Sequence, residues 1–127
     1  MPLNKTTDEI VIRVIGLLST VAEPKYPHNR PAKNPPVKFI VVNGFCVAPG
    51  IMQRFVINVN CHARNISSGN IDRVSLDTMA KSVLGILEEF DAPNDLIIEA
   101  DGEEIFSEPN CNEHYSNLRF IVKSINN

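Results

Sequence analysis

Five of the nine prolines in this 127-residue chain lie between residues 24 and 36, and no other feature restricts the fold as strongly. Each proline fixes φ and removes a backbone donor, so this segment is neither a helix nor a central strand. It is also too long for a tight connection within a compact domain. We therefore expect an exposed, semi-rigid arm at residues 24–36, with a helix before it and strands after it.

Two interpretations of this arm stay open. In the first, it is a disordered surface loop. In the second, it docks on a neighbouring subunit or another partner through Tyr26, His28 and Arg30. A stiff arm suits the second role because it loses less conformational entropy on docking than a flexible one.

The segment before the arm has the pattern of an amphipathic helix. Thr6 and Glu9 have the spacing of a capping box, and Asp8 adds negative charge where the helix dipole favours it. We expect this helix over residues 7–21, with Pro24 ending it. Its broad apolar face requires a covering layer; that face consists of Ile10, Val11, Val14, Ile15, Leu17, Leu18 and Val21.

Two strands are predicted directly after the arm. Residues 38–43 are mostly apolar and β-branched, and Asn43-Gly44 is typical of a turn that ends a strand. Residues 53–62 alternate apolar with mainly polar side chains, which indicates a half-buried strand. The connection through Pro49-Gly50 is too long for a two-residue hairpin loop, and we interpret it as an extended loop.

A second amphipathic helix follows a turn at residues 67–70, which supplies its N-cap and leaves Asp72 in the first helical turn. Asp91-Ala92-Pro93 is expected to end it. Its apolar residues recur at helical spacing; they are Leu76, Met79, Ala80, Val83, Leu84, Ile86, Leu87 and Phe90.

The remaining residues are predicted to form strands. Asp101-Gly102 is a strong signal for a two-residue turn between strands at 96–100 and 103–106. This hairpin would place Glu99 opposite Glu104, a mildly destabilising like-charge pair. A last, edge-like strand is expected over residues 115–125. The predicted fold class is therefore α+β: residues 1–127 form a single domain, with a mainly antiparallel β-sheet packed against two amphipathic α-helices.

Composition and charge exclude several classes of function. The net charge of −3 and the scattered lysines and arginines argue against specific nucleic-acid binding. No stretch approaches the roughly 18 apolar residues of a membrane span, and the first residues lack the features of an export signal. The three cysteines cannot all pair within one chain, so reduced thiols in a cytoplasm are the simplest interpretation.

No reaction centre is predicted, and we expect no catalytic, cofactor-binding or metal-binding residues. Cys61-His62 and Cys111-x-x-His114 offer zinc-type ligands, but adjacent residues of a strand point to opposite faces. Cys61 is instead interpreted as a small buried apolar residue. Cys46 is placed in a loop and Cys111 in a turn, so neither has the helix N-terminus that lowers the pKa of a nucleophilic thiol.

Two polar clusters remain as candidates for contact surfaces. Glu103 and Glu104 belong to an acidic hairpin tip, whose carboxylates are either solvated turn residues or ligands for a hard cation. His114, Tyr115 and Arg119 begin and occupy the last strand. They are either satisfied by local turn bonds or serve as polar anchors of a subunit contact.

The layout resembles that of the tail-completion (tail-terminator) proteins of long-tailed bacteriophages and prophages. The likeness covers most of the chain. It rests on the helix at 7–21, the strand Phe-Val-Ile-Asn-Val-Asn-Cys at 55–61, the Gly69-Asn70 lead into a helix, and the closing Glu-His-Tyr-Ser-Asn-Leu-Arg-Phe-Ile-Val at 113–122.

The resemblance implies a non-enzymatic virion assembly subunit with no cofactor. It implies a ring, usually of six copies, that ends tail-tube growth and contacts tail-tube and head-completion proteins. Its location would be the host cytoplasm during assembly and then the virion tail. Glu103 and Glu104 would face the bore and repel passing DNA. Two alternatives remain, a protein- or peptide-binding adaptor and a small enzyme whose site forms between subunits.

Overall fold

A computed structural model of the chain describes residues 4–92 and 95–126. Its elements confirm the predicted fold class, a single small α+β domain with one mostly antiparallel sheet of five strands and two α-helices. In chain order they are α1 (Thr7–Leu17), β1 (Lys25–Pro27), β2 (Lys38–Ala48), β3 (Met52–Arg64), α2 (Arg73–Glu89), β4 (Leu96–Glu108), the short 3₁₀ helix η1 (Pro109–Cys111) and β5 (Glu113–Ile125).

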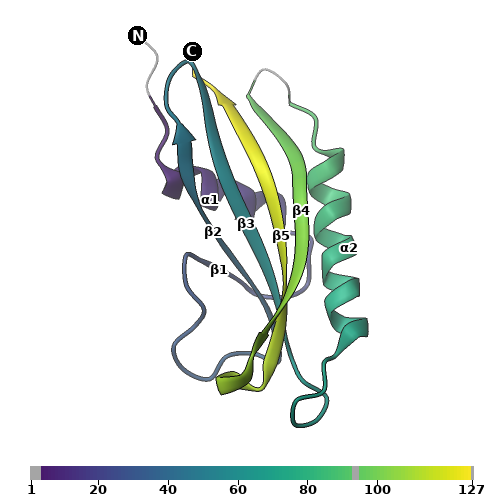
Figure 1. Cartoon of the computed structure of the whole chain (residues 1–127). Helices are drawn as coiled ribbons and strands as arrows, with labels where there is room; N and C mark the ends of the chain where they lie inside the picture. The colour runs from purple at the N-terminus through teal and green to yellow at the C-terminus, as the bar shows by residue number, and fades with distance from the viewer. Residues whose placement is uncertain (1–3, 93–94, 127) are drawn as a thin grey trace.

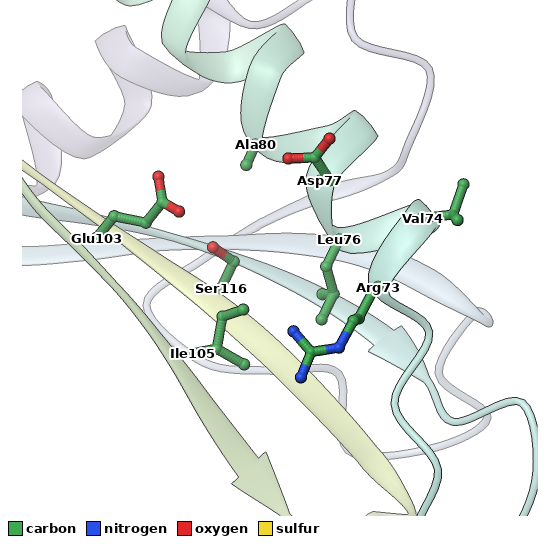
Figure 2. A pocket seen from close by; sticks show the side chains of 8 residues that line it. All are labelled: Arg73, Val74, Leu76, Asp77, Ala80, Glu103, Ile105 and Ser116. Carbon is green, nitrogen blue, oxygen red and sulfur yellow. The ribbon is translucent and has the colours of Figure 1, made fainter.

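The strands lie in the order β1-β2-β3-β5-β4, and every neighbouring pair is antiparallel except β1 and β2. Both helices pack on one face of this sheet, with α1 against β1 and β2 and α2 against β3, β4 and β5 (Figure 1). We call the opposite face the open face. Between α2 and β4 the two layers leave a groove of about 370 Å³ (Figure 2).

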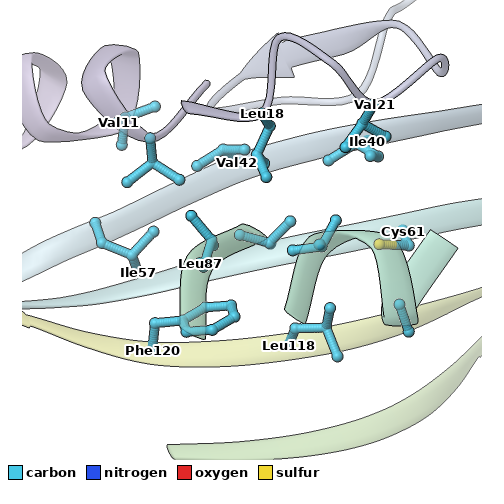
Figure 3. Close-up of a cluster of buried hydrophobic side chains, with 14 of the residues drawn as sticks. Val11, Leu18, Val21, Ile40, Val42, Ile57, Cys61, Leu87, Leu118 and Phe120 are labelled. Atoms are coloured by element: carbon cyan, nitrogen blue, oxygen red, sulfur yellow. The ribbon is translucent and has the colours of Figure 1, made fainter. Parts of the chain in front are cut away.

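The core lies between the helices and the sheet (Figure 3). The alternation predicted for the second strand is confirmed, because Phe55, Ile57, Val59 and Cys61 are fully buried on the helix-facing side. Burial, followed by the negative charges of two glutamates, raises the pKa of the Cys61 thiol to about 12. Cys61 is therefore a protonated apolar residue of the core, as the sequence predicted.

The first helix begins as predicted and ends earlier. Thr6 and Glu9 form the capping box, with the Glu9 backbone N–H donating to the Thr6 hydroxyl. The helix stops at Leu17 and not at Val21, because the chain must turn to bring residue 24 beside the sheet. There the Pro24 carbonyl accepts a hydrogen bond from the Ile40 backbone N–H.

The second helix also differs at its start. Asp72 is its N-cap and not a residue of its first turn, since its carboxylate accepts a hydrogen bond from the Ser75 backbone N–H. Pro93, which was predicted to end this helix, lies outside the described residues.

Neither predicted turn in the sheet is a turn. β2 continues through Asn43-Gly44 to Ala48, and Gly44 pairs with Ile57. A Cβ on Gly44 would clash with the Val56 carbonyl oxygen. Glycine is therefore needed here because β2 and β3 approach each other closely. Cys46 is consequently in a strand, and the connection between β2 and β3 is the short segment 49–51.

The predicted hairpin at Asp101-Gly102 is also wrong, because β4 runs through it as one strand. A register shift between Ala100 and Gly102 makes this site a β-bulge against β5. Glu104 pairs with Asn117 and Glu99 with Ile121, so the expected like-charge pair is absent. The chain instead reverses at η1 and Asn112, whose φ of 50° is left-handed. As a result β5 lies between β3 and β4 and is not an edge strand.

The two ends of the described chain lie side by side at the β2–β3 turn (Figure 1). The Lys5 backbone N–H donates to the Gln53 side chain over 2.8 Å, and Lys5 Nζ donates to Asn126 Oδ1 over 3.0 Å. Asn126 also donates to the Gly50 carbonyl over 2.8 Å. These bonds fix both ends to the same end of the sheet.

Candidate functional site: two sheet edges and the folded arm

The sheet has two edges that differ in shape. On one side, the outer edge of β4 carries no further strand among the described residues. On the other side, β1 covers β2 only at Ile40, Val41 and Val42. The outer edge of β2 beyond this point, residues 43–48, has no strand partner within the described chain. Unpaired edges of this kind are templates for pairing with another chain.

The β4 edge is acidic. Residues 96–108 contain five carboxylates and no lysine or arginine. Two of them are paired across to β5, with Asp101 3.0 Å from Arg119 and Glu99 3.2 Å from Lys123. The other three have no ion-pair partner among the described residues; they are Glu103, Glu104 and Glu108.

The opposite side of the sheet, formed by β1, the arm and the start of β2, is basic, and we call it the basic edge. Residues 25–38 contain Lys25, Arg30, Lys33, Lys38 and His28, and no carboxylate. The Lys25 ammonium donates to the Val21 carbonyl. Lys33 and Lys38 are exposed and form no ion pair with a described residue. The two edges of one sheet therefore carry opposite charge.

The arm does not project from the domain; it folds back over the open face. Arg30 donates to the Glu113 carboxylate over 3.0 Å, lies 5.5 Å from the Phe39 ring centroid and also contacts the Cys111 sulfur. His28 lies 2.7 Å from the Asp8 carboxylate. The Tyr26 ring meets Phe39 edge-on at 6.0 Å. All three predicted docking residues thus make contacts within their own chain.

Beneath the arm lies a buried polar group that we call the clasp, formed by Arg30, His62 and Glu113. His62 Nδ1 is 2.9 Å from a Glu113 oxygen, and these two side chains are only 7% and 6% exposed. The His62 ring is stacked between Phe39 and Tyr115 at 4.6 and 4.7 Å. Burial lowers the pKa of His62, and the Glu113 carboxylate opposes this only in part.

Sequence reasoning missed the clasp. Its members come from the arm, from β3 and from the start of β5, so no local spacing relates them. The stacked rings cover His62 on both sides, which leaves the clasp suited to fixing the arm. Cys61 and His62 point to opposite faces, as predicted, and the described residues contain no group of three or more possible metal ligands.

The three residues predicted as anchors on the last strand do not form one surface. His114 Nδ1 bonds to Asn65 over 2.7 Å, Tyr115 stacks on His62 and on Phe106 at 5.3 Å, and Arg119 pairs with Asp101. Only Arg119 remains substantially exposed, at 49% of its side chain. Because β5 is an inner strand, a partner can reach Tyr115 and Arg119 only from the open face, whereas His114 lies on the helix-facing side of the sheet.

Glu103 and Glu104 are exposed strand residues and not a hairpin tip. Because side chains alternate along a strand, the two carboxylates point to opposite faces. Glu103 lines the groove beside α2, and Glu104 lies with its partner Asn117 on the open face. At most one of them could therefore face the bore of a ring.

The groove adjoins the acidic edge. Leu76 and Ala80 of α2 form its apolar side, facing Ile105 of β4 and Ser116 of β5 (Figure 2). Arg73 and Asp77 stand at the α2 side. Ile105 remains 44% exposed and Val74 78%. The acidic edge is therefore flanked by an apolar recess.

Comparison of the sequence with models of known protein families finds no match, and neither does comparison with curated proteins. Within the described part of the chain, neither helix is both long and apolar enough to cross a bilayer.

Proposed function

We propose that this protein is an assembly subunit that joins copies of itself head to tail through its two sheet edges. The observation that carries this proposal is the opposite charge of those edges. Within the described part of the chain, Glu103 and Glu104 on the β4 edge and Lys33 and Lys38 on the basic edge have no ion-pair partner. Two acidic edges repel each other, whereas an acidic edge attracts the basic edge of the next copy.

Contacts between unlike surfaces generate rings when the rotation between copies closes. A ring is also what the resemblance to phage tail-completion proteins implies. We propose that the subunit forms such a ring, of about six copies in that family, at the head-proximal end of a tail tube. The tail-tube and head-completion proteins are then its further partners.

A peptide-binding adaptor is the second candidate, favoured by the apolar groove beside the unpaired β4 edge. In that case an extended basic peptide adds to β4 and places apolar side chains in the groove. Such a protein remains monomeric without its peptide, so the measurement of mass in solution separates the two candidates.

The test is native mass spectrometry and light scattering at low and moderate salt, with electron microscopy of any oligomer. We expect one closed oligomer at low salt that weakens as salt screens the edges. The double charge reversal Glu103→Lys with Glu104→Lys should abolish assembly. The matched control reverses the exposed Glu88 and Glu89 of α2 and should assemble normally.

Mixing two charge-reversed variants is the decisive experiment. Chains carrying Lys33→Glu and Lys38→Glu should not assemble alone but should associate with the Glu103→Lys, Glu104→Lys chains. A wild-type protein that stays monomeric at every concentration and salt level contradicts the proposal.

A further inference from the structure

We infer that the junction between copies is a continuous antiparallel β-ladder. In it, residues 43–47 of β2 in one copy pair with residues 97–101 of β4 in the next. This inference rests on the proposed head-to-tail assembly and adds the register of its contact.

The directions of the two edge strands suit this pairing. β2 and β5 run the same way through the sheet, and β3 and β4 run the opposite way. In a ring, all copies have the same orientation relative to the axis. The β2 edge of one copy therefore meets the β4 edge of the next antiparallel, the arrangement that gives the more stable pairing per residue.

The free backbone groups of β2 follow from its pairing with β1. The Ile40 backbone N–H donates to Pro24, and the Val42 carbonyl accepts from His28, so both residues point toward β1. Because orientation alternates along a strand, Gly44 and Cys46 point the same way. No described strand covers them there, and their N–H and C=O groups are free for a partner.

The outer edge of β4 also has free backbone groups. The Asp95 carbonyl accepts from the Ile125 backbone N–H and thus points toward β5. By alternation Ile98 and Ala100 point outward, away from β5. Both edges therefore present two outward-pointing residues, separated by one residue.

These residues stand at matching heights in the sheet. Rows of paired residues cross the strands from β2 to β4, and two rows end in the outward-pointing residues. The rows are Gly44–Ile57–Phe120–Ala100 and Cys46–Phe55–Val122–Ile98. Pairing Gly44 with Ala100 and Cys46 with Ile98 of the next copy thus requires no step along the strands, as a flat ring demands.

The bulge in β4 lies where the ladder must end. Below residue 43, β1 occupies the outer edge of β2, so the next copy's β4 must diverge there. The row that contains Val42 and Pro27 reaches β4 at Glu103, just after the bulge at Asp101. A bulge bends its strand. Beyond it, the rows of Glu103 and Glu104 reach Pro27 and Tyr26 of the neighbouring copy, beside Lys25. Further along, the row of Ser107 reaches Lys38, which places Lys38 beside Glu108.

The ladder also covers exposed apolar surface. Phe45, which is 56% exposed, lies on the open face between Gly44 and Cys46. In the inferred register Phe45 stands opposite Glu99, with Ile97 of the same strand diagonally adjacent on that face. The aromatic ring and the aliphatic stem of the glutamate exclude water from the junction.

The test is a disulfide between Phe45→Cys and Glu99→Cys on one chain, in a background with Cys46→Ser and Cys111→Ser. Cys61 stays because it is buried. Directly opposite cysteines of an antiparallel pair fall within disulfide range. We expect mild oxidation to give a covalent ladder of chains up to the full ring, on the order of tenfold faster than in the control.

The control combines Phe45→Cys with Glu104→Cys. Glu104 is exposed on the same face but lies below the bulge, so this pair should not link. Ala100→Pro is a second variant, since it removes an outward N–H and leaves the bonds to β5. It should abolish assembly while shifting the melting temperature by no more than a few degrees.

The outcomes separate the two claims. If the wild type forms a ring but the Phe45→Cys, Glu99→Cys chains fail to link, or if Ala100→Pro assembles normally, the register is wrong and the proposed function stands. If the wild type is a monomer under all conditions, both are overturned.

Discussion

The two faces of the sheet are stabilised by different interactions. The helix-facing side is an apolar core that buries Phe55 and its neighbours. The hydrophobic effect stabilises it, and this effect is non-directional and does not depend on pH. The open face is held at one end by the clasp, whose hydrogen bonds are directional and whose histidine can titrate. The core defines the domain, whereas the clasp positions the arm and with it the basic edge.

The largest expected effect lies in the core. Phe55→Ala should lower the free energy of unfolding by roughly 3–5 kcal/mol, because it removes buried area and leaves a cavity. Denaturant unfolding at several pH values measures this, and the loss should be the same at each pH. Ile12→Ala, at a side chain of α1 that is 50% exposed, is the control and should cost far less. Equal losses at both positions would contradict the assignment of the core.

The clasp should show the next largest effect. Glu113→Ala leaves His62 and Arg30 without their shared partner, and we expect a loss of about 2–3 kcal/mol. The arm should also detach, because its bond to β5 is gone. Hydrogen exchange of the Ile40 and His28 backbone amides reports this release. Unchanged protection in the variant would show that the prolines alone hold the arm.

The pH dependence separates the two faces most sharply. The pKa of His62 is lowered in the folded state, so below its ordinary value near 6.5 the unfolded chain binds the proton more readily. Stability should therefore be full at pH 8 and fall as the pH drops below about 6.5. Thermal melts measure this. His62→Gln should flatten this part of the profile, whereas His114→Gln should retain it.

The smallest effect is expected at the surface. Arg13 pairs with Asp95, and both side chains are 42% exposed. The hydrogen bond from Arg13 lowers the pKa of Asp95, but solvent screens the interaction. Arg13→Ala should therefore cost less than about 1 kcal/mol, with the loss decreasing in added salt. A loss as large as that of Glu113→Ala would remove the distinction between exposed and buried charge.

The helices, the alternating strand and the fold class were predictable because each depends on residues close in sequence. The capping box at Thr6 and the alternation from Phe55 to Cys61 are local patterns, and the structure confirms both. The turns at Asn43-Gly44 and Asp101-Gly102 were wrong for one reason. A long neighbouring strand offers backbone partners along its whole length, and this outweighs local turn preference.

The candidate site was less predictable. The arm residues were singled out as docking contacts, and the structure shows them in contacts within their own chain. Those partners were not predictable, because Arg30 and Glu113 are 83 positions apart. The acidic residues of β4 were predicted to cluster at a hairpin tip. In the structure they lie along a single edge strand, so they form an acidic edge and not a tip. The edges themselves are products of strand order, which no local pattern in this chain specifies.

The placement of both chain ends at the β2–β3 turn has a practical consequence for any ring. Lys5 and Asn126 of every copy would emerge on the same rim. A fluorescent protein fused at either end would then place one label per copy on that rim and none on the opposite rim. Images of such labelled particles would reveal the polarity of the ring and count its subunits directly.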